Sequence, residues 1–129
     1  PLPQTQQTFP TITQAKILRV TEAHQTLLKS ISEVGYVNPT PIQQLAIPTI
    51  LSGKDVVSSS ITGSGKTAAF LLPILQRYFH AAAVGYIRAL IVTPTRELAI
   101  QIHEEFEKLN KYTKLEACLV IGGSSIQRQ

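Results

Sequence analysis

Apolar residues recur along this chain at two different spacings. Four stretches carry them three or four residues apart, as on one face of a helix. They predict helices over about 26–34, 41–50, 65–79 and 96–111. Thr40 and Thr95 stand directly before two of these helices, where a hydroxyl can cap the first turn. Pro48 is expected to bend or shorten its helix, and Pro73 to kink the next one.

Three shorter stretches, about 56–60, 89–92 and 115–121, predict β-strands. The middle one, Ala89-Leu90-Ile91-Val92, is continuously apolar, which is typical of a strand buried on both faces. Strands that alternate with helices of this length predict an α/β fold with an open parallel sheet and flanking helices. Residues 1–14 are rich in Pro, Gln and Thr and are expected to form a flexible N-terminal segment.

Composition narrows the class of protein. The chain has 129 residues, of which 43% are hydrophobic and 16% charged, values that fit a globular protein rather than a disordered one. No apolar run is long enough to span a membrane, and the N-terminus does not resemble a signal peptide. The net charge of +4 permits a polyanionic partner without requiring one. Because methionine is absent, the chain is expected to be part of a longer protein.

Cysteine and histidine usage excludes two kinds of site. Cys118 is the only cysteine, so no internal disulfide can form, and its apolar surroundings predict a buried structural thiol. A reducing intracellular compartment fits that composition. The three histidines lie on different predicted elements without metal-ligand spacing, so no metal site built on histidine is expected.

The segment Ser60–Thr67 carries the strongest chemical signal. It joins a predicted strand to a predicted helix and ends in Gly-Lys-Thr, the pattern that holds a nucleoside triphosphate. The glycines let backbone N–H groups surround an anion, and the new helix adds its unpaired N–H groups. Lys66 is expected to reach the β- and γ-phosphates, and the Thr67 hydroxyl to ligate Mg²⁺. The predicted nucleotide contacts here are Thr62, Gly63, Ser64, Gly65, Lys66, Thr67 and Ala68.

Two further motifs flank this loop. Gly35-Tyr36-Val37-Asn38-Pro39-Thr40-Pro41-Ile42-Gln43 precedes it, and Pro94-Thr95-Arg96-Glu97-Leu98-Ala99 follows the second predicted strand. Ligands in open α/β sheets gather at the carboxyl ends of the strands. The second motif is therefore expected on the same rim as the phosphate loop.

Together these segments resemble the DEAD-box RNA helicases. The residues from Gly35 to Gln43 are similar to the Q motif of that family, and Ser60–Thr67 to motif I. Pro94–Ala99 is similar to motif Ia, and Gly122-Gly123 to the GG motif. The resemblance covers roughly residues 18–129 and implies a P-loop, RecA-like fold, with residues 15–129 forming the N-terminal portion of that domain. The stretch Ile61–Phe70 is also similar to the nucleolar ribosome-assembly branch, so a nuclear, nucleolar or cytoplasmic location is expected.

The resemblance implies two sets of contacts beyond the phosphates. Gln43 would select ATP, since an amide can pair with the N6 and N7 edge of adenine. Tyr36 lies on this adenine side, although packing is favoured over base stacking. The family's adenine-stacking aromatic residue is replaced by Leu18, and the loop's usual first glycine by Ser60.

RNA-backbone contacts are implied at Pro94, Thr95, Arg96, Gly122 and Gly123. Such contacts fix the position of an RNA without reading its sequence. An arginine in the first turn opposes the helix dipole, so local stability does not explain Arg96.

Parts of the family's catalytic apparatus do not occur in the sequence. Asp55 is the only aspartate and precedes a strand rather than ending one. The Asp-Glu-Ala-Asp motif, the Ser-Ala-Thr motif and the second RecA-like domain, an expected partner, are not among these residues. The chain alone is therefore expected neither to hydrolyse ATP appreciably nor to unwind RNA. Strands that would flank the phosphate-loop strand are not encoded here either, so the sheet is expected to be incomplete.

Two other functions remain open from the sequence. A phosphate-loop enzyme of another class, such as a small-molecule kinase, explains Ser60–Thr67 but not the flanking motifs. A non-catalytic nucleotide- or RNA-binding module is the other possibility. It is consistent with Leu18 and Ser60, which differ from the residues usual in the family.

Overall fold

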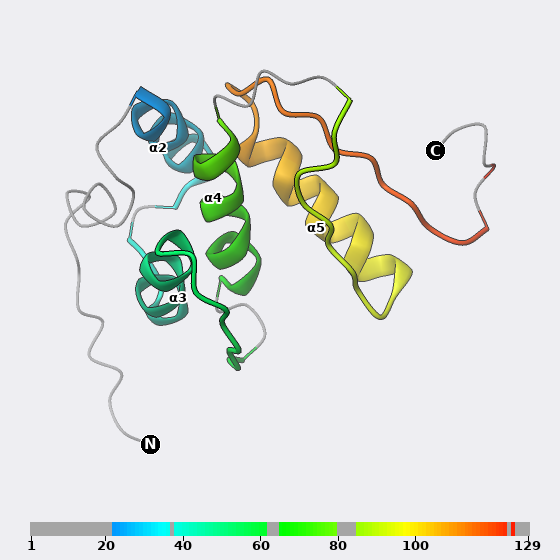
Figure 1. The fold of residues 1–129 in the computed structure, drawn as a ribbon, viewed down its shortest axis with the longest axis horizontal. Helices are drawn as coiled ribbons and strands as arrows, with labels where there is room; N and C mark the ends of the chain where they lie inside the picture. The colour runs from blue at the N-terminus through cyan, green and yellow to red at the C-terminus, as the bar shows by residue number, and fades with distance from the viewer. Residues whose placement is uncertain (1–21, 37, 62–64, 80–84, 124, 126–129) are drawn as a thin grey trace.

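The computed structural model describes residues 22–36, 38–61, 65–79, 85–123 and 125. These residues contain the helices α2 (Glu22–Val34), α3 (Pro41–Leu51), α4 (Lys66–Tyr78) and α5 (Arg96–Leu109), shown in Figure 1. All four predicted helices are confirmed. The largest difference is at the start of α2, which begins at Glu22 rather than Thr26.

Gly35 ends α2 in the way its sequence position predicts. Its φ of +90° lies in the left-handed region, which glycine adopts without steric cost. The Gly35 N–H donates to Ser32 O at 3.0 Å, and the Tyr36 N–H donates to Ile31 O at 3.1 Å. These two bonds form a Schellman motif, which satisfies carbonyls that the end of a helix would otherwise leave unpaired.

Threonine caps begin α3 and α5, as predicted. Thr40 and Thr95 both have extended backbones, and their hydroxyls accept from N–H groups three residues later. The distances are 3.4 Å to Gln43 N and 3.2 Å to Leu98 N. Each cap pairs one N–H group that the first turn of a helix leaves unsatisfied.

Both internal prolines lie within continuous helices. α3 extends past Pro48 to Leu51, one residue further than predicted, so Pro48 does not shorten it. α4 likewise continues through Pro73 to Tyr78. Pro73 is fully buried, and its burial offsets the backbone hydrogen bond that a proline ring removes.

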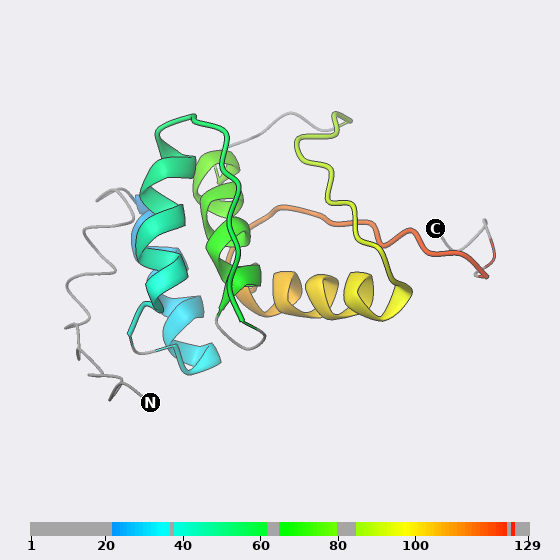
Figure 2. The same cartoon turned by 90° about the horizontal axis from the view of Figure 1, so that it is seen from below.

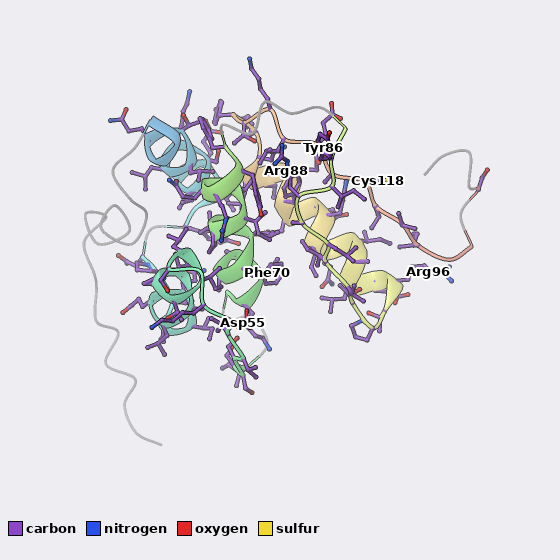
Figure 3. All side chains as sticks on the ribbon, viewed as in Figure 1. Asp55, Phe70, Tyr86, Arg88, Arg96 and Cys118 are labelled. Atoms are coloured by element: carbon purple, nitrogen blue, oxygen red, sulfur yellow. The ribbon has the colours of Figure 1, made fainter. Side chains whose placement is uncertain are left out.

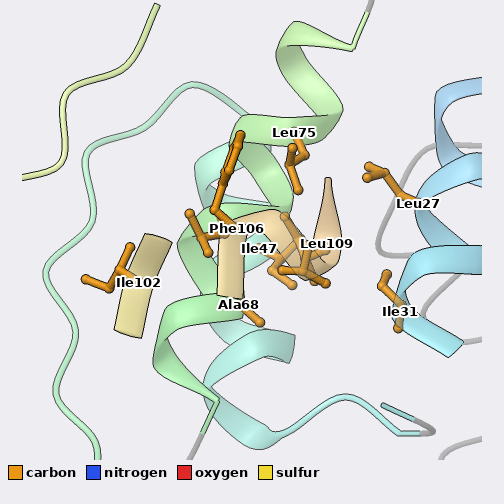
Figure 4. Close-up of a cluster of buried hydrophobic side chains, with 10 residues drawn as sticks. Leu27, Ile31, Ile47, Ala68, Leu75, Ile102, Phe106 and Leu109 are labelled. Atoms are coloured by element: carbon orange, nitrogen blue, oxygen red, sulfur yellow. The ribbon is translucent and has the colours of Figure 1, made fainter. Parts of the chain in front are cut away.

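α4 lies at the centre of the helical packing, because α2, α3 and α5 all contact it. α3 makes the most extensive of these contacts, and Figure 2 shows the two helices side by side with α5 crossing nearby. Figure 4 shows the shared core. Its buried members are Leu27, Ile31, Ile47, Ala68, Leu71, Leu72, Leu75, Ile102, Phe106 and Leu109. Burying a leucine of this kind stabilises the fold by about 1.5–3 kcal/mol.

The predicted strands are not formed among the described residues. Segments 56–60, 89–92 and 115–121 run as open chain without β-pairing. Most of their apolar side chains are exposed, such as Leu90 at 83% and Val92 at 82%, whereas Leu115 packs against the core. An isolated strand has no neighbour to satisfy its backbone or to cover its faces, so these runs do not become strands by sequence alone.

The expectation that Cys118 is a buried structural thiol is wrong. It is exposed rather than buried, and Figure 3 places it on the segment that follows α5. Its apolar run would enclose the thiol only within a packed sheet, which the described residues do not form. In this part of the chain no group of three His, Cys, Asp or Glu side chains is placed to hold a metal ion. No described helix combines the length and apolar character needed to cross a bilayer.

The central position of α4 predicts a large cost for Leu71→Ala. Leu71 is 0% exposed, so the change leaves a cavity and should lower the free energy of unfolding by about 2–5 kcal/mol. Leu45 on α3 is 73% exposed, and Leu45→Ala should change it by no more than about 0.5 kcal/mol. Urea denaturation of both variants checks this. Equal losses would contradict a core centred on α4.

Candidate nucleotide and RNA sites

The start of α4 forms the described half of the predicted phosphate loop. Gly65 occupies the N-cap position, and no described side chain caps this helix. Its first-turn N–H groups therefore lack the hydroxyl acceptors that Thr40 and Thr95 give to α3 and α5. An uncapped helix start of this kind is suited to an anion. The other loop residues predicted to contact phosphate, 62–64, lie outside the described residues.

Only glycine fits at position 65. Its φ of +83° is left-handed, and a methyl group added there would lie 2.5 Å from Gln43 Nε2 and 3.0 Å from Thr40 Oγ1. Both atoms belong to the start of α3. The end of the phosphate loop is thus in close contact with the motif that precedes it in the sequence.

Gln43 makes that contact through a buried amide. The side chain is 4% exposed, and its Oε1 accepts from Thr40 N at 3.0 Å, which completes a capping box. Its Nε2 donates to Gly65 O at 3.3 Å. One side chain therefore caps α3 and ties it to the first residue before α4.

Lys66, Thr67 and Ala68 form the first turn of α4. Lys66 is exposed, and its Nζ donates to Ser60 O at 2.6 Å, across the base of the loop. Thr67 is half-buried and Ala68 is buried in the core. The lysine that is expected to bind phosphate is thus held by an exposed hydrogen bond to the neutral carbonyl of Ser60.

Tyr36 is the second residue of the first motif, and its side chain faces α5. Its ring packs against the core, as expected, and its hydroxyl donates to Glu105 Oε1. Burial, followed by the hydrogen bond to Glu105, raises the pKa of Tyr36 to about 12. The phenol therefore stays protonated and remains a donor throughout the physiological pH range.

Two of the predicted RNA-contacting segments meet at Arg96. A methyl group added at Gly123, whose φ is +82°, would lie 3.2 Å from Arg96 Nη1. Arg96 is exposed at the first turn of α5, directly after the Thr95 cap, and Figure 3 shows it at the outer end of that helix. Pro94 and Gly122 are exposed beside them. The Arg96 guanidinium at this end of α5 is therefore exposed, with the exposed Glu97 beside it in the same turn.

Sequence reasoning missed two features of the site. The first is the use of Gln43 to cap α3. The Thr40-x-x-Gln43 spacing is a capping-box pattern, so the sequence does contain a signal for it. The Tyr36–Glu105 bond joins residues 69 positions apart, and no local pattern predicts it. Leu18, at the expected adenine-stacking position, lies outside the described residues.

Comparison with known proteins decides the family. The model of the DEAD/DEAH box helicase family matches residues 40–129, more than half of the chain. This chain belongs to the DEAD/DEAH box helicase family. The match includes Gln43, the phosphate loop, Arg96 and Gly123.

Individual helicases of this family are similar to the chain over most of its length. DEAD-box ATP-dependent RNA helicase 28 of Oryza sativa subsp. japonica is 52% identical over 104 residues, which are 80% of this chain and 13% of the relative. DEAD-box ATP-dependent RNA helicase RhpA of Helicobacter pylori is 47% identical over 105 residues, 81% of the chain and 21% of the relative. The chain thus spans between 13% and 21% of the length of these relatives.

Two solved helicase-family structures share the fold with a TM-score of 0.72. One is the RNA helicase Prp28 from Chaetomium thermophilum bound to ADP, which is 40% identical and matches 84% of this chain and 28% of that one. The other is a DEAD box protein from Methanococcus jannaschii, 38% identical, matching 79% and 28%. The RecA-like fold expected for this DEAD/DEAH box chain is supported, although its described residues form no sheet.

The close approach at Gly65 gives a test specific to this candidate site. Gly65→Ala should cost about 1–3 kcal/mol of unfolding free energy from the left-handed backbone, and more from the clash with Gln43. Gly53→Ala is the matched control, because Gly53 has a φ of +84° but open space around it. Urea denaturation measures both variants. If the two lose the same free energy, the contact with Gln43 is not a constraint.

Proposed function

We propose that this chain binds ATP and an RNA backbone as part of an ATP-dependent RNA helicase. The observation that carries the proposal is the hydrogen bond from Gln43 Nε2 to Gly65 O. It brings an amide suited to adenine against a helix start suited to phosphate. The relatives named above, described as ATP-dependent RNA helicases, support the same activity.

Gln43 keeps hydrogen-bonding capacity for a base. A carboxamide has two lone pairs on oxygen and two N–H groups. Thr40 N uses one lone pair and Gly65 O uses one N–H. One acceptor and one donor are left, which is the complement of the adenine N6 amino group and N7. Gln43 therefore retains the donor and the acceptor that adenine requires while it keeps the contacts that hold it.

The start of α4 supplies the phosphate side of the proposed site. The N–H groups of its first turn have no side-chain cap and lie at the positive end of the helix dipole, which stabilises negative charge. Lys66 would exchange the Ser60 carbonyl for a phosphate oxygen, a stronger, charge-assisted bond. The Thr67 hydroxyl would hold Mg²⁺, which neutralises charge on the phosphates when bound.

Arg96 and the Gly123 backbone form the proposed RNA contact, with Pro94, Thr95 and Gly122 around them. The guanidinium is exposed and lies beside a glycine without side-chain bulk, so a phosphodiester can approach both. A backbone contact of this type binds RNA irrespective of sequence.

The remaining parts of the proposal concern the longer protein. Residues 15–129 would form the N-terminal portion of a RecA-like domain with a parallel sheet, working with a second RecA-like domain. A nuclear, nucleolar or cytoplasmic location belongs to the same proposal. A small-molecule kinase is not favoured, because the family match extends well beyond the phosphate loop.

The lysine of the loop gives the direct test of this function. Lys66→Ala should weaken ATP binding about 10- to 100-fold, since it removes hydrogen bonds to a charged group, and should abolish RNA-stimulated ATP hydrolysis by the complete helicase. Titration with ATP and a phosphate-release assay measure the two effects. Lys54→Ala removes an exposed lysine outside the loop and serves as the control. ATP binding without any RNA-stimulated hydrolysis in the unmodified helicase would instead indicate a non-catalytic module.

Arg96→Ala should weaken RNA binding uniformly across sequences. Loss of one phosphate contact is expected to reduce the slope of log affinity against log salt by about 0.7 for a single strand. The stability of α5 should not decrease, because an arginine in the first turn opposes the helix dipole. Fluorescence anisotropy with single-stranded RNA at several salt concentrations measures the slope. Lys108→Ala, an exposed change in the last turn of α5, should leave the slope unaltered.

A further inference from the structure

One hydrogen bond connects the nucleotide side of the molecule with the RNA side. The Tyr36 hydroxyl donates to Glu105 Oε1, and both residues are half-buried. Tyr36 lies between α2 and α3, seven residues before Gln43, whereas Glu105 lies on α5. Neither residue has a part in the phosphate or RNA contacts proposed above.

The Tyr36 end of this bond is fixed by the backbone. The Schellman motif at the end of α2 holds its N–H group on Ile31 O at 3.1 Å. The chain then passes the buried Pro39 and enters the capping box in which Thr40 and Gln43 hold one another. The phenol is therefore held at the end of α2, seven residues before the amide that contacts Gly65.

The Glu105 end is fixed to Arg96 by a helix. Glu105 is nine residues after Arg96 on α5, a separation of about 13 Å along the axis at 1.5 Å per residue. α5 is packed into the core by Ile102, Phe106 and Leu109, so it moves as one body. A displacement of α5 at Glu105 is transmitted to the guanidinium beside Gly123.

We propose that the Tyr36–Glu105 hydrogen bond couples ATP binding to RNA binding. It does so by holding α5, and with it Arg96, in a fixed position relative to the Gln43–Gly65 contact. Tyr36 and Glu105 act as positioning residues rather than as ligands. The inference rests on the proposed function, and it assigns the coupling to two residues outside both sites. Because coupling is a property of binding free energies, RNA strengthens ATP binding by the same factor as ATP strengthens RNA binding.

A second tyrosine–glutamate contact, between α2 and the residues just after α5, provides a control for the loss of such a bond. Glu33 in the last turn of α2 accepts from Tyr112 Oη and from Lys111 Nζ, the latter at 2.9 Å, just beyond the end of α5. It is exposed and lies at the end of α5 away from Arg96. Tyr112→Phe thus removes a tyrosine–glutamate bond of the same chemistry without altering the segment that leads to Gln43.

The experiment measures the coupling factor in the complete helicase. This factor is the ratio of the dissociation constants for a non-hydrolysable ATP analogue with Mg²⁺, measured without and with saturating poly(U) RNA. Tyr36→Phe keeps the ring and should lower the factor about threefold to tenfold, the range expected for one hydrogen bond. Glu105→Ala should do the same, and the double variant should lose no more than either alone. Glu105→Gln retains an acceptor and should restore part of the factor.

Controls separate coupling from stability. Glu104→Gln, an exposed charge change next to Glu105, and Tyr112→Phe should leave the factor unchanged within twofold. An unaltered factor in Tyr36→Phe, or an equal loss in Tyr112→Phe, would overturn the inference. An unmodified helicase that binds both ligands with no mutual effect would also overturn it while leaving the proposed function intact. Failure to bind the analogue or the RNA at all would overturn both.

Discussion

The burial of α4 against the other three helices is the constraint on which the rest of the structure depends. The buried face of α4 fixes the direction in which its N-terminus points, and that N-terminus is the candidate phosphate site. α3 packs closely on α4, and this packing places Gln43 on Gly65. The geometry of the candidate nucleotide site is therefore a consequence of core packing, and the glycine at position 65 is what permits so close an approach.

The helices could be predicted because their signals are local. Thr40, Thr95 and Gly35 mark helix ends through hydrogen bonds to residues three to five positions away, which a sequence displays directly. The strands could not be established in the same way. The run at residues 89–92 shows that its side chains favour burial, but it does not show which neighbour would bury them. Cys118 was misjudged for the same reason, since its burial depended on a sheet absent from the described residues.

The residues of the candidate site also fall into those that local motifs predict and those that depend on tertiary packing. Lys66, Thr67 and Gln43 follow from motif spacing, and the structure brings the two motifs into contact. Arg96 and Gly123 are 27 residues apart, yet they lie close together because the chain after α5 runs back past the start of that helix. Glu105 carried no sequence signal, because a glutamate on the third turn of an amphipathic helix is ordinarily a solvated residue. Its role depends on where Tyr36 is placed, which is determined by the packing of α2 on α5 and by the hydrogen bonds that end α2.

The two sites differ in how firmly the described residues hold them. Gln43 and Gly65 both lie at the starts of helices that pack on one another, and each is linked by hydrogen bonds to its own helix. Arg96 begins a helix, but Gly123 belongs to open chain whose apolar neighbours, such as Val120, are exposed. The proposed nucleotide side is thus preorganised by the helical core, whereas the proposed RNA side has one fixed and one weakly supported partner. The Tyr36–Glu105 bond reaches α5, which carries Arg96, the fixed partner, and it is therefore placed to pass the position of the proposed nucleotide side to the proposed RNA side.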